Sequence, residues 1–122
     1  MTERARVLVV DDERDIRQAV AEILAGEGYQ VAAAGDGEEA LAQVRAFHPQ
    51  LVLLDLMMPG MSGWEFLRAQ RGDPELRTIP VIVVSAVAGV PEPELEGQAI
   101  IRKPFDLDEL ITAVRLHAGT AA

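Results

Sequence analysis

Short apolar runs that end in polar residues constrain the fold of this chain more than any other feature of its sequence. A continuous apolar run of four or five residues is typical of a strand buried on both faces of a parallel sheet. The polar residues that close or follow these runs are Asp11 and Asp12 after residues 7–10, Asp55 after 51–54, Ser85 after 81–84, and Lys103 after 99–102.

Segments with helical spacing separate the runs. Capping residues and breakers set their limits: Asp36 with Glu39 three positions later predicts a helix start, and His48 followed by Pro49 predicts its end. A weaker strand is expected over 30–34. Helices are expected from about 16 to 26–28, from 36 to 48, and from about 64 to 71. A last helix, capped by Asp106 and Glu109, is expected over 107–114. Five strands alternating with helices predict an α/β fold, a doubly wound five-stranded parallel sheet.

Composition excludes several classes of protein. A length of 122 residues with 49% apolar residues predicts one domain over 1–122, and a net charge of −9 argues against direct binding to nucleic acid. The absence of cysteine excludes disulfides and thiolate metal sites. No stretch has the length or apolar character of a membrane span or a signal peptide, so we expect no membrane partner and a cytoplasmic location.

The polar residues at the strand ends predict a functional site. The carboxyl ends of parallel strands converge on one edge of the sheet, where ligands bind in this class of fold. Three carboxylates, a hydroxyl and an ammonium that meet there suit Mg²⁺ and a phosphoryl group, because Mg²⁺ prefers oxygen ligands.

A competing motif needs an explanation. Residues 35–40 match the dinucleotide fingerprint G-x-G-x-x-A, and Asp55 follows twenty positions later. However, the helix start that would hold a pyrophosphate carries three acidic side chains, which would repel it. The dinucleotide reading also leaves Ser85 and Lys103 unexplained. It is therefore rejected.

Four segments in order resemble the receiver domain of two-component response regulators, over nearly the whole chain. They are Val-Val-Asp-Asp-Glu at 9–13, Leu-Leu-Asp-Leu-Met-Met-Pro-Gly at 53–60, Val-Ser-Ala at 84–86, and Lys-Pro-Phe at 103–105. The resemblance implies strand order 2-1-3-4-5, which is flavodoxin-like. It also implies that Asp55 accepts a phosphoryl group from a sensor histidine kinase or phosphotransfer protein, and that the domain then signals to a downstream protein.

The resemblance further implies a role for each site residue. Asp12, Asp55 and the backbone carbonyl of Met57 are the expected protein ligands of Mg²⁺, with Asp11 acting through water. Lys103 would supply a positive charge to the phosphoryl oxygens, and Ser85 a hydroxyl donor.

Two alternatives stay open at this point. An aspartate-nucleophile phosphohydrolase would also use Asp55, but Met57 stands where such an enzyme has its acid/base carboxylate. The other alternative is a degenerate receiver that serves as a constitutive protein-docking module. It is suggested by Ile100, which occupies the position of the family's switch aromatic, three residues before the lysine.

The segment between Ser85 and Lys103 departs from the family pattern. It is several residues short, and residues 87–97 contain two prolines and two glycines. That leaves too little chain for a full crossover helix, so the fourth helix of the family is expected to be shortened or missing. Because the sequence ends at Ala122, we expect a stand-alone or excised receiver. Because Met57 cannot act as an acid or base, we expect a switch and not an enzyme.

Overall fold

The computed structural model describes residues 5–56, 58, 60, 62–85 and 99–118. Strands and helices alternate over most of this range. In chain order they are β1 (Arg6–Val10), α1 (Arg14–Gly26), β2 (Gln30–Ala34), α2 (Gly37–Phe47), β3 (Leu51–Asp55), α3 (Gly63–Arg71), β4 (Val81–Ser85), β5 (Ala99–Arg102) and α4 (Leu107–Ala118).

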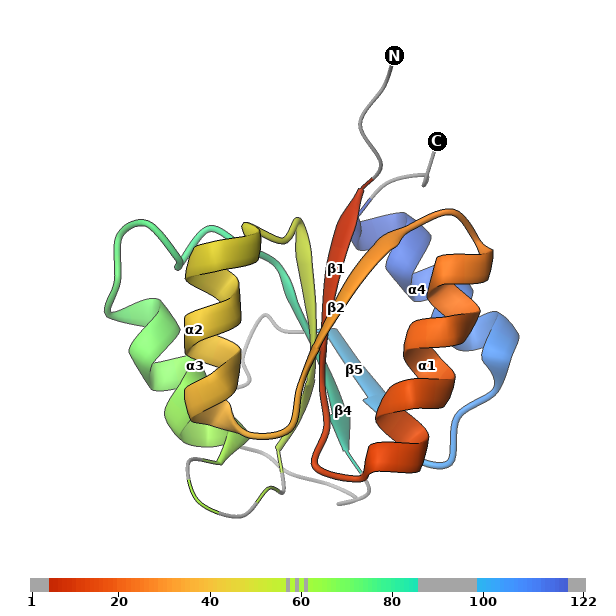
Figure 1. Cartoon of the computed structure of the whole chain (residues 1–122), viewed down its shortest axis with the longest axis horizontal. Helices are drawn as coiled ribbons and strands as arrows, with labels where there is room; N and C mark the ends of the chain where they lie inside the picture. Colours follow the sequence, from red (N-terminus) through yellow and green to blue (C-terminus); the bar gives the residue numbers. More distant parts are fainter. Residues whose placement is uncertain (1–4, 57, 59, 61, 86–98, 119–122) are drawn as a thin grey trace.

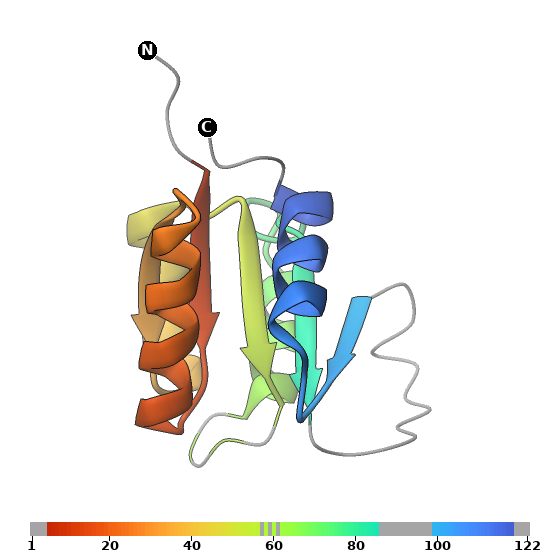
Figure 2. The same cartoon turned by 90° about the vertical axis from the view of Figure 1, so that its right-hand side faces the viewer.

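The five strands form one parallel sheet in the order β2-β1-β3-β4-β5. This confirms the predicted fold class and strand order. All strands run in the same direction, downward in Figure 2, so that their carboxyl ends lie along one edge. The order reverses between β1 and β3, and this switch point is where ligands bind in open α/β sheets.

Helices cover both faces of the sheet (Figure 1). Helices α2 and α3 lie on one face, and α1 and α4 lie on the other. A hydrophobic core lies on each face of the sheet, and alternate strand residues belong to one or the other. Leu8 and Leu54 face α2 and α3, whereas Val7 and Leu53 face α1 and α4. Asp55 has the same parity as Leu53, so it ends β3 on the side of α1 and α4.

Local hydrogen bonds explain where α2 begins and ends. The Asp36 side chain accepts a hydrogen bond from the Glu39 N–H at 2.8 Å, as its capping position predicts. The Glu39 carboxylate accepts from the N–H of Gly35, one residue before the cap. His48 closes the helix in the left-handed conformation, with φ of 52°.

The predicted element limits need small corrections. Strands β1, β3 and β4 each gain one residue, namely Arg6, Asp55 and Ser85, because pairing with neighbouring strands continues to these positions. Asp106 caps the start of α4 through the N–H of Asp108 at 2.9 Å. The prediction of a shortened or missing fourth helix concerns residues that lie outside the described ranges. Among the described helices, none has the length and apolar character that crossing a bilayer requires.

Candidate functional site

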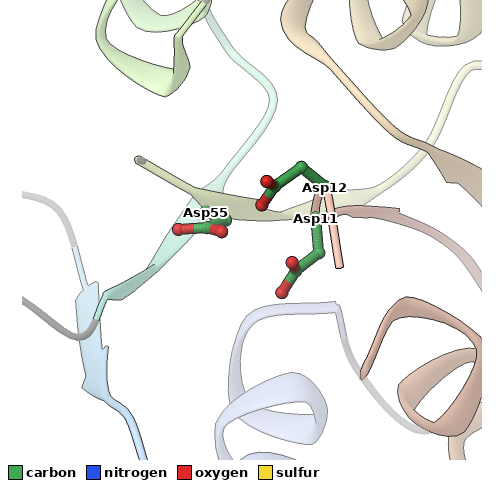
Figure 3. Close-up of side chains that lie close together, drawn as sticks. All are labelled: Asp11, Asp12 and Asp55. Carbon is green, nitrogen blue, oxygen red and sulfur yellow. The ribbon is translucent and has the colours of Figure 1, made fainter. Parts of the chain in front are cut away.

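Three carboxylates gather where β1 and β3 end (Figure 3). Asp11 and Asp12 follow β1, Asp55 closes β3, and one carboxylate oxygen of each lies within 4.8 Å of the others. Asp11 and Asp55 are each only 5% exposed. The side chain of Asp12 points toward Asp55 in Figure 3. The expected meeting of these groups at the switch point is therefore observed.

Lys103 brings a positive charge to this cluster from the turn after β5. Its Nζ lies 2.8 Å from Oδ2 of Asp11 and 3.5 Å from Oδ2 of Asp55. Burial by itself lowers the pKa of Lys103. The hydrogen bond from Lys103 to Asp11 and the charges of Asp11, Asp55 and Glu13 outweigh that effect, and the pKa of Lys103 lies above its ordinary value. Lys103 therefore remains an ammonium at neutral pH.

Hydrogen bonds hold both the side chain and the backbone of Asp11. Its Oδ1 accepts from the Glu13 N–H at 2.9 Å, its Oδ2 accepts from Lys103, and its own N–H donates to the Ala34 carbonyl at 3.1 Å. By contrast, none of the described residues hydrogen-bonds the Asp12 carboxylate. The site therefore combines a fixed carboxylate with one that is available to a ligand.

The start of α3 packs closely against the backbone at Asp55 and Leu56. The Gly63 N–H donates to the carbonyl oxygen of Leu56 at 3.1 Å. A Cβ at position 63 would collide with the carbonyl oxygen of Asp55 and would lie 2.7 Å from the Cα of Leu56. Only glycine permits this approach, so Gly63 fixes the position at which β3 delivers Asp55.

Most of the predicted site residues are thereby placed. Ser85 ends β4 and pairs with Arg102, one position beyond the pairing of Asp55 with Val84. Its backbone reaches the same edge, but its side chain lies outside the part of the chain that is described, as does Met57. Ile100 lies on β5 opposite Val83 and is 48% exposed.

Sequence reasoning missed two residues that shape the site. Gly63 carried a signal only as part of a turn, because a close backbone approach leaves no other trace in sequence. Arg17 donates from Nη1 to the carbonyl oxygen of Asp11 at 2.8 Å. The sequence did carry a sign of this role, because Arg17 is a charged residue on the same face of the helix as the buried Val20 and Leu24.

The donor set fits a hard divalent cation. Carboxylate oxygens are preferred ligands of Mg²⁺, and the cluster carries three negative charges against the single charge of Lys103. Two of the carboxylates are buried, where like charges repel most strongly. A bound cation would relieve this repulsion, so the residues present form a candidate divalent metal site.

Comparison with known proteins gives the same family over most of the chain. A family model described as the response regulator receiver domain matches residues 7–115. The DNA-binding response regulator MtrA of Mycobacterium tuberculosis is 39% identical over 118 residues, which cover 93% of this chain and 50% of that protein. The probable transcriptional regulator ycf27 of Porphyridium aerugineum is 37% identical over 117 residues, which cover 93% of this chain and 48% of that protein. The chain thus spans about half the length of these curated relatives.

Solved structures of similar proteins share the fold. Chemotaxis protein CheY4 of Vibrio cholerae superposes with a TM-score of 0.85 at 33% identity, covering 93% of this chain and 98% of that one. Response regulator TrrA of Thermotoga maritima, solved in complex with Mg²⁺ and BeF, superposes with a TM-score of 0.82 at 34% identity, covering 92% and 97%.

Proposed function

Because this chain belongs to the response regulator receiver domain family, we propose that Asp55 is its phosphoacceptor and that phosphorylation there depends on Mg²⁺. The receiver would span residues 1–122. The donor would be a phosphohistidine of a sensor histidine kinase or phosphotransfer protein. One observation carries the proposal: Asp55 lies in a cluster of three carboxylates with the ammonium of Lys103 at 3.5 Å.

The transfer is a displacement at phosphorus. A carboxylate oxygen of Asp55 forms a bond to the phosphorus as the bond from phosphorus to the donor imidazole nitrogen breaks, and the imidazole leaves. Asp11, Asp12 and Asp55 would hold Mg²⁺ together with the Met57 carbonyl, Asp11 acting through water. The cation would neutralise charge on the phosphoryl oxygens, which otherwise repel a carboxylate nucleophile.

Lys103 has two tasks in this scheme. Before transfer it offsets the charges of Asp11 and Asp55, which supports burial of both. During transfer it would supply its ammonium to a phosphoryl oxygen, a point charge on a flexible stem that can follow the incoming group. Ser85 would add a hydroxyl donor to the phosphorylated state. The domain would take part in its own phosphorylation and in slow dephosphorylation without being an enzyme for another substrate.

An apolar hollow beside the site suits a protein donor. It has a volume of about 380 Å³ and is lined by Ile16, Lys103, Pro104 and Phe105. Exposed apolar surface next to a charged centre is typical of a site that a partner protein covers. The phosphorylated form would then act on a downstream protein. The comparisons give no support to the alternative of a constitutive docking module.

The test is phosphorylation by a small donor such as acetyl phosphate, followed by intact mass spectrometry. We expect the wild-type chain to gain one phosphoryl mass with Mg²⁺ and none with excess chelator. Asp55→Asn should gain none under either condition. Asp36→Asn is the matched control, because asparagine also caps a helix and the site stays intact. Labelling of Asp55→Asn at the wild-type level would refute the assignment.

A further inference from the structure

Arg17 contacts the backbone of the loop that carries Asp11 and Asp12. Its Nη1 donates to the main-chain carbonyl oxygen of Asp11 at 2.8 Å. The side chain is only partly exposed and belongs to α1, six residues after Asp11. A cation that contacts Asp11 would ordinarily be expected to pair with its carboxylate. Here Lys103 pairs with the Asp11 carboxylate, and Arg17 instead binds the backbone.

The bond fixes one peptide plane. The carbonyl of Asp11 belongs to the peptide that joins Asp11 to Asp12, so Arg17 sets the direction from which the Asp12 side chain leaves the backbone. The preceding peptide is fixed as well, because the Asp11 N–H donates to the Ala34 carbonyl at 3.1 Å. Asp12 has no hydrogen-bond partner of its own among the described residues. Its aim toward Asp55 therefore depends on the backbone that Arg17 holds.

The start of α1 offers this loop little other support. Glu13 occupies the position that caps α1, and its side chain makes no capping hydrogen bond. The Glu13 N–H is satisfied by the Asp11 carboxylate at 2.9 Å. That carboxylate also binds Lys103, which would be drawn toward an incoming phosphoryl group. The bond from Arg17, like the bond from the Asp11 N–H to Ala34, does not depend on Lys103.

The guanidinium of Arg17 is also seated against a second loop. A Cβ built on Gly35 would lie 3.1 Å from Nη1 and 3.7 Å from Cζ of Arg17. Glycine at this position, just after β2, therefore leaves room for the guanidinium. The Gly35 N–H is itself held by the Glu39 carboxylate at 3.2 Å. Arg17 thus links the turn after β1 to the turn after β2.

We propose that Arg17 is a positioning residue for the metal site: by fixing the Asp11–Asp12 peptide against Gly35 it aims the Asp12 carboxylate at the cation. The inference rests on the proposed function, in that it presumes a divalent cation held by the three carboxylates. Removing a residue that orients a metal ligand without touching the metal typically weakens metal affinity by about ten-fold or more.

The sign of the effect separates positioning from simple electrostatics. Arg17 is a positive charge near the cation site, so its charge alone repels Mg²⁺, and Arg17→Met should then bind Mg²⁺ more tightly. Positioning predicts the reverse. We expect Arg17→Met to bind Mg²⁺ about five- to ten-fold more weakly than the wild type, as measured by titration calorimetry. Arg14→Met is the matched control, because Arg14 is exposed in the same helix, and its loss should leave affinity unchanged or slightly tighter.

A second variant tests the same contact without changing charge. Gly35→Ala places a methyl group against the guanidinium and should weaken Mg²⁺ binding by about two-fold, since the flexible side chain can yield by a few tenths of an ångström. In the double variant Gly35→Ala, Arg17→Met, the glycine change should have no further effect, because the contact it disturbs is already gone. Arg17→Lys should restore part of the affinity.

The outcomes are distinguishable. If the wild type binds no Mg²⁺, the metal site of the proposed function is wrong, and this inference falls with it. If the wild type binds Mg²⁺ and Arg17→Met binds it equally or more tightly, the inference alone is overturned. Thermal melts of each variant identify any that fail to fold. Should Arg17→Met be one of them, Gly35→Ala and Arg17→Lys decide the matter.

Discussion

The two ends of the sheet use charged side chains in opposite ways. At the amino end, Nε of Arg6 donates to the carbonyl oxygens of Phe47 and His48 at 3.0 and 2.9 Å, and Arg115 pairs with Glu27 at 2.6 Å. These two arginines are thus paired with acceptor oxygens of the fold. At the carboxyl end, one ammonium faces three carboxylates, two of which are buried.

The contrast separates contacts that close the fold from contacts that wait for a ligand. Arg6 satisfies carbonyls at the end of α2, which have no partner within the helix. The pair of Arg115 and Glu27 joins the ends of α4 and α1. The acidic end, however, holds three carboxylates against the ammonium of Lys103 and the guanidinium of Arg17, and we expect the remaining negative charge to lower the stability of the folded state without metal.

The largest expected effect concerns Asp12, whose carboxylate has no hydrogen-bond partner among the described residues. Asp12→Ala should lose Mg²⁺ binding and phosphorylation, because Asp12 is one of three carboxylates that would hold the cation and has no described hydrogen bond that stabilises the fold. Without metal, the variant should be as stable as the wild type or more stable by roughly 0.5–1 kcal/mol, through relief of repulsion. Calorimetric titration and urea denaturation measure the two effects.

Asp15→Ala provides the control for charge. Asp15 lies in the first turn of α1 and outside the acidic cluster. The control should keep Mg²⁺ binding and phosphorylation. Phosphorylation of Asp12→Ala at the wild-type rate and at low Mg²⁺ would remove the contrast between the two ends of the sheet.

The second expected effect concerns Lys103. Lys103→Met removes the described cation that neutralises Asp11 and Asp55, and it should lower the free energy of unfolding by about 2 kcal/mol without metal. Mg²⁺ should bind this variant more tightly than the wild type, because a competing positive charge is gone. The variant should therefore recover more stability than the wild type on addition of Mg²⁺, as thermal melts would show. Equal recovery in both proteins would contradict this account.

The pH dependence of the same group gives a third prediction. The pKa of Lys103 is raised above its ordinary value of 10.5, so the folded state binds the proton more tightly than the unfolded state. Its stabilising contribution is therefore complete below about pH 10.5 and is lost as the pH rises through the higher value in the folded protein. The stability difference between wild type and Lys103→Met should be constant from pH 7 to 10 and shrink above that. A difference that already shrinks near pH 8 would contradict the assignment.

Much of the fold was predictable because its signals are local. The strand over Gln30–Ala34 and the strand over Ala99–Arg102 match the predicted limits, since apolar pattern and flanking turns define each one. The cap at Asp36 was predictable for the same reason: a side chain and an N–H three residues apart determine it. Resemblance to the receiver family supplied the strand order, which local pattern does not contain.

The fine geometry of the site could not be predicted from sequence. Lys103 was expected to serve the phosphoryl group on Asp55, and its Nζ lies closer to Asp11. The choice between the two carboxylates depends on where β1, β3 and β5 sit relative to one another. Gly63 and Arg17 act on the backbone of neighbouring segments, Gly63 on Asp55 and Leu56 and Arg17 on Asp11. Such contacts follow from tertiary packing, and residue type at one position does not reveal them.

At the amino end, Arg6→Met should have a moderate effect, and on stability alone. Arg6 donates to two carbonyls at the end of α2, and its loss should lower the free energy of unfolding by about 1–2 kcal/mol. Phosphorylation and Mg²⁺ affinity should not change, because the contact lies at the far end of the sheet from Asp55. A drop in Mg²⁺ affinity comparable to that expected for Arg17→Met would mean that the two ends are coupled.

The smallest effect is expected at the pair of Arg115 and Glu27. The two side chains are 56% and 32% exposed, so water and salt screen their attraction although the atoms lie 2.6 Å apart. A double-mutant cycle with Arg115→Met and Glu27→Gln should give a coupling of less than about 1 kcal/mol, and this coupling should shrink in high salt. The buried pair of Lys103 and Asp11, with side chains 13% and 7% exposed, should lose less of its coupling at the same salt concentration. If salt reduces both coupling energies equally, burial does not distinguish the two ends of the sheet. The difference between the ends would then rest on the excess of carboxylates at the acidic end alone.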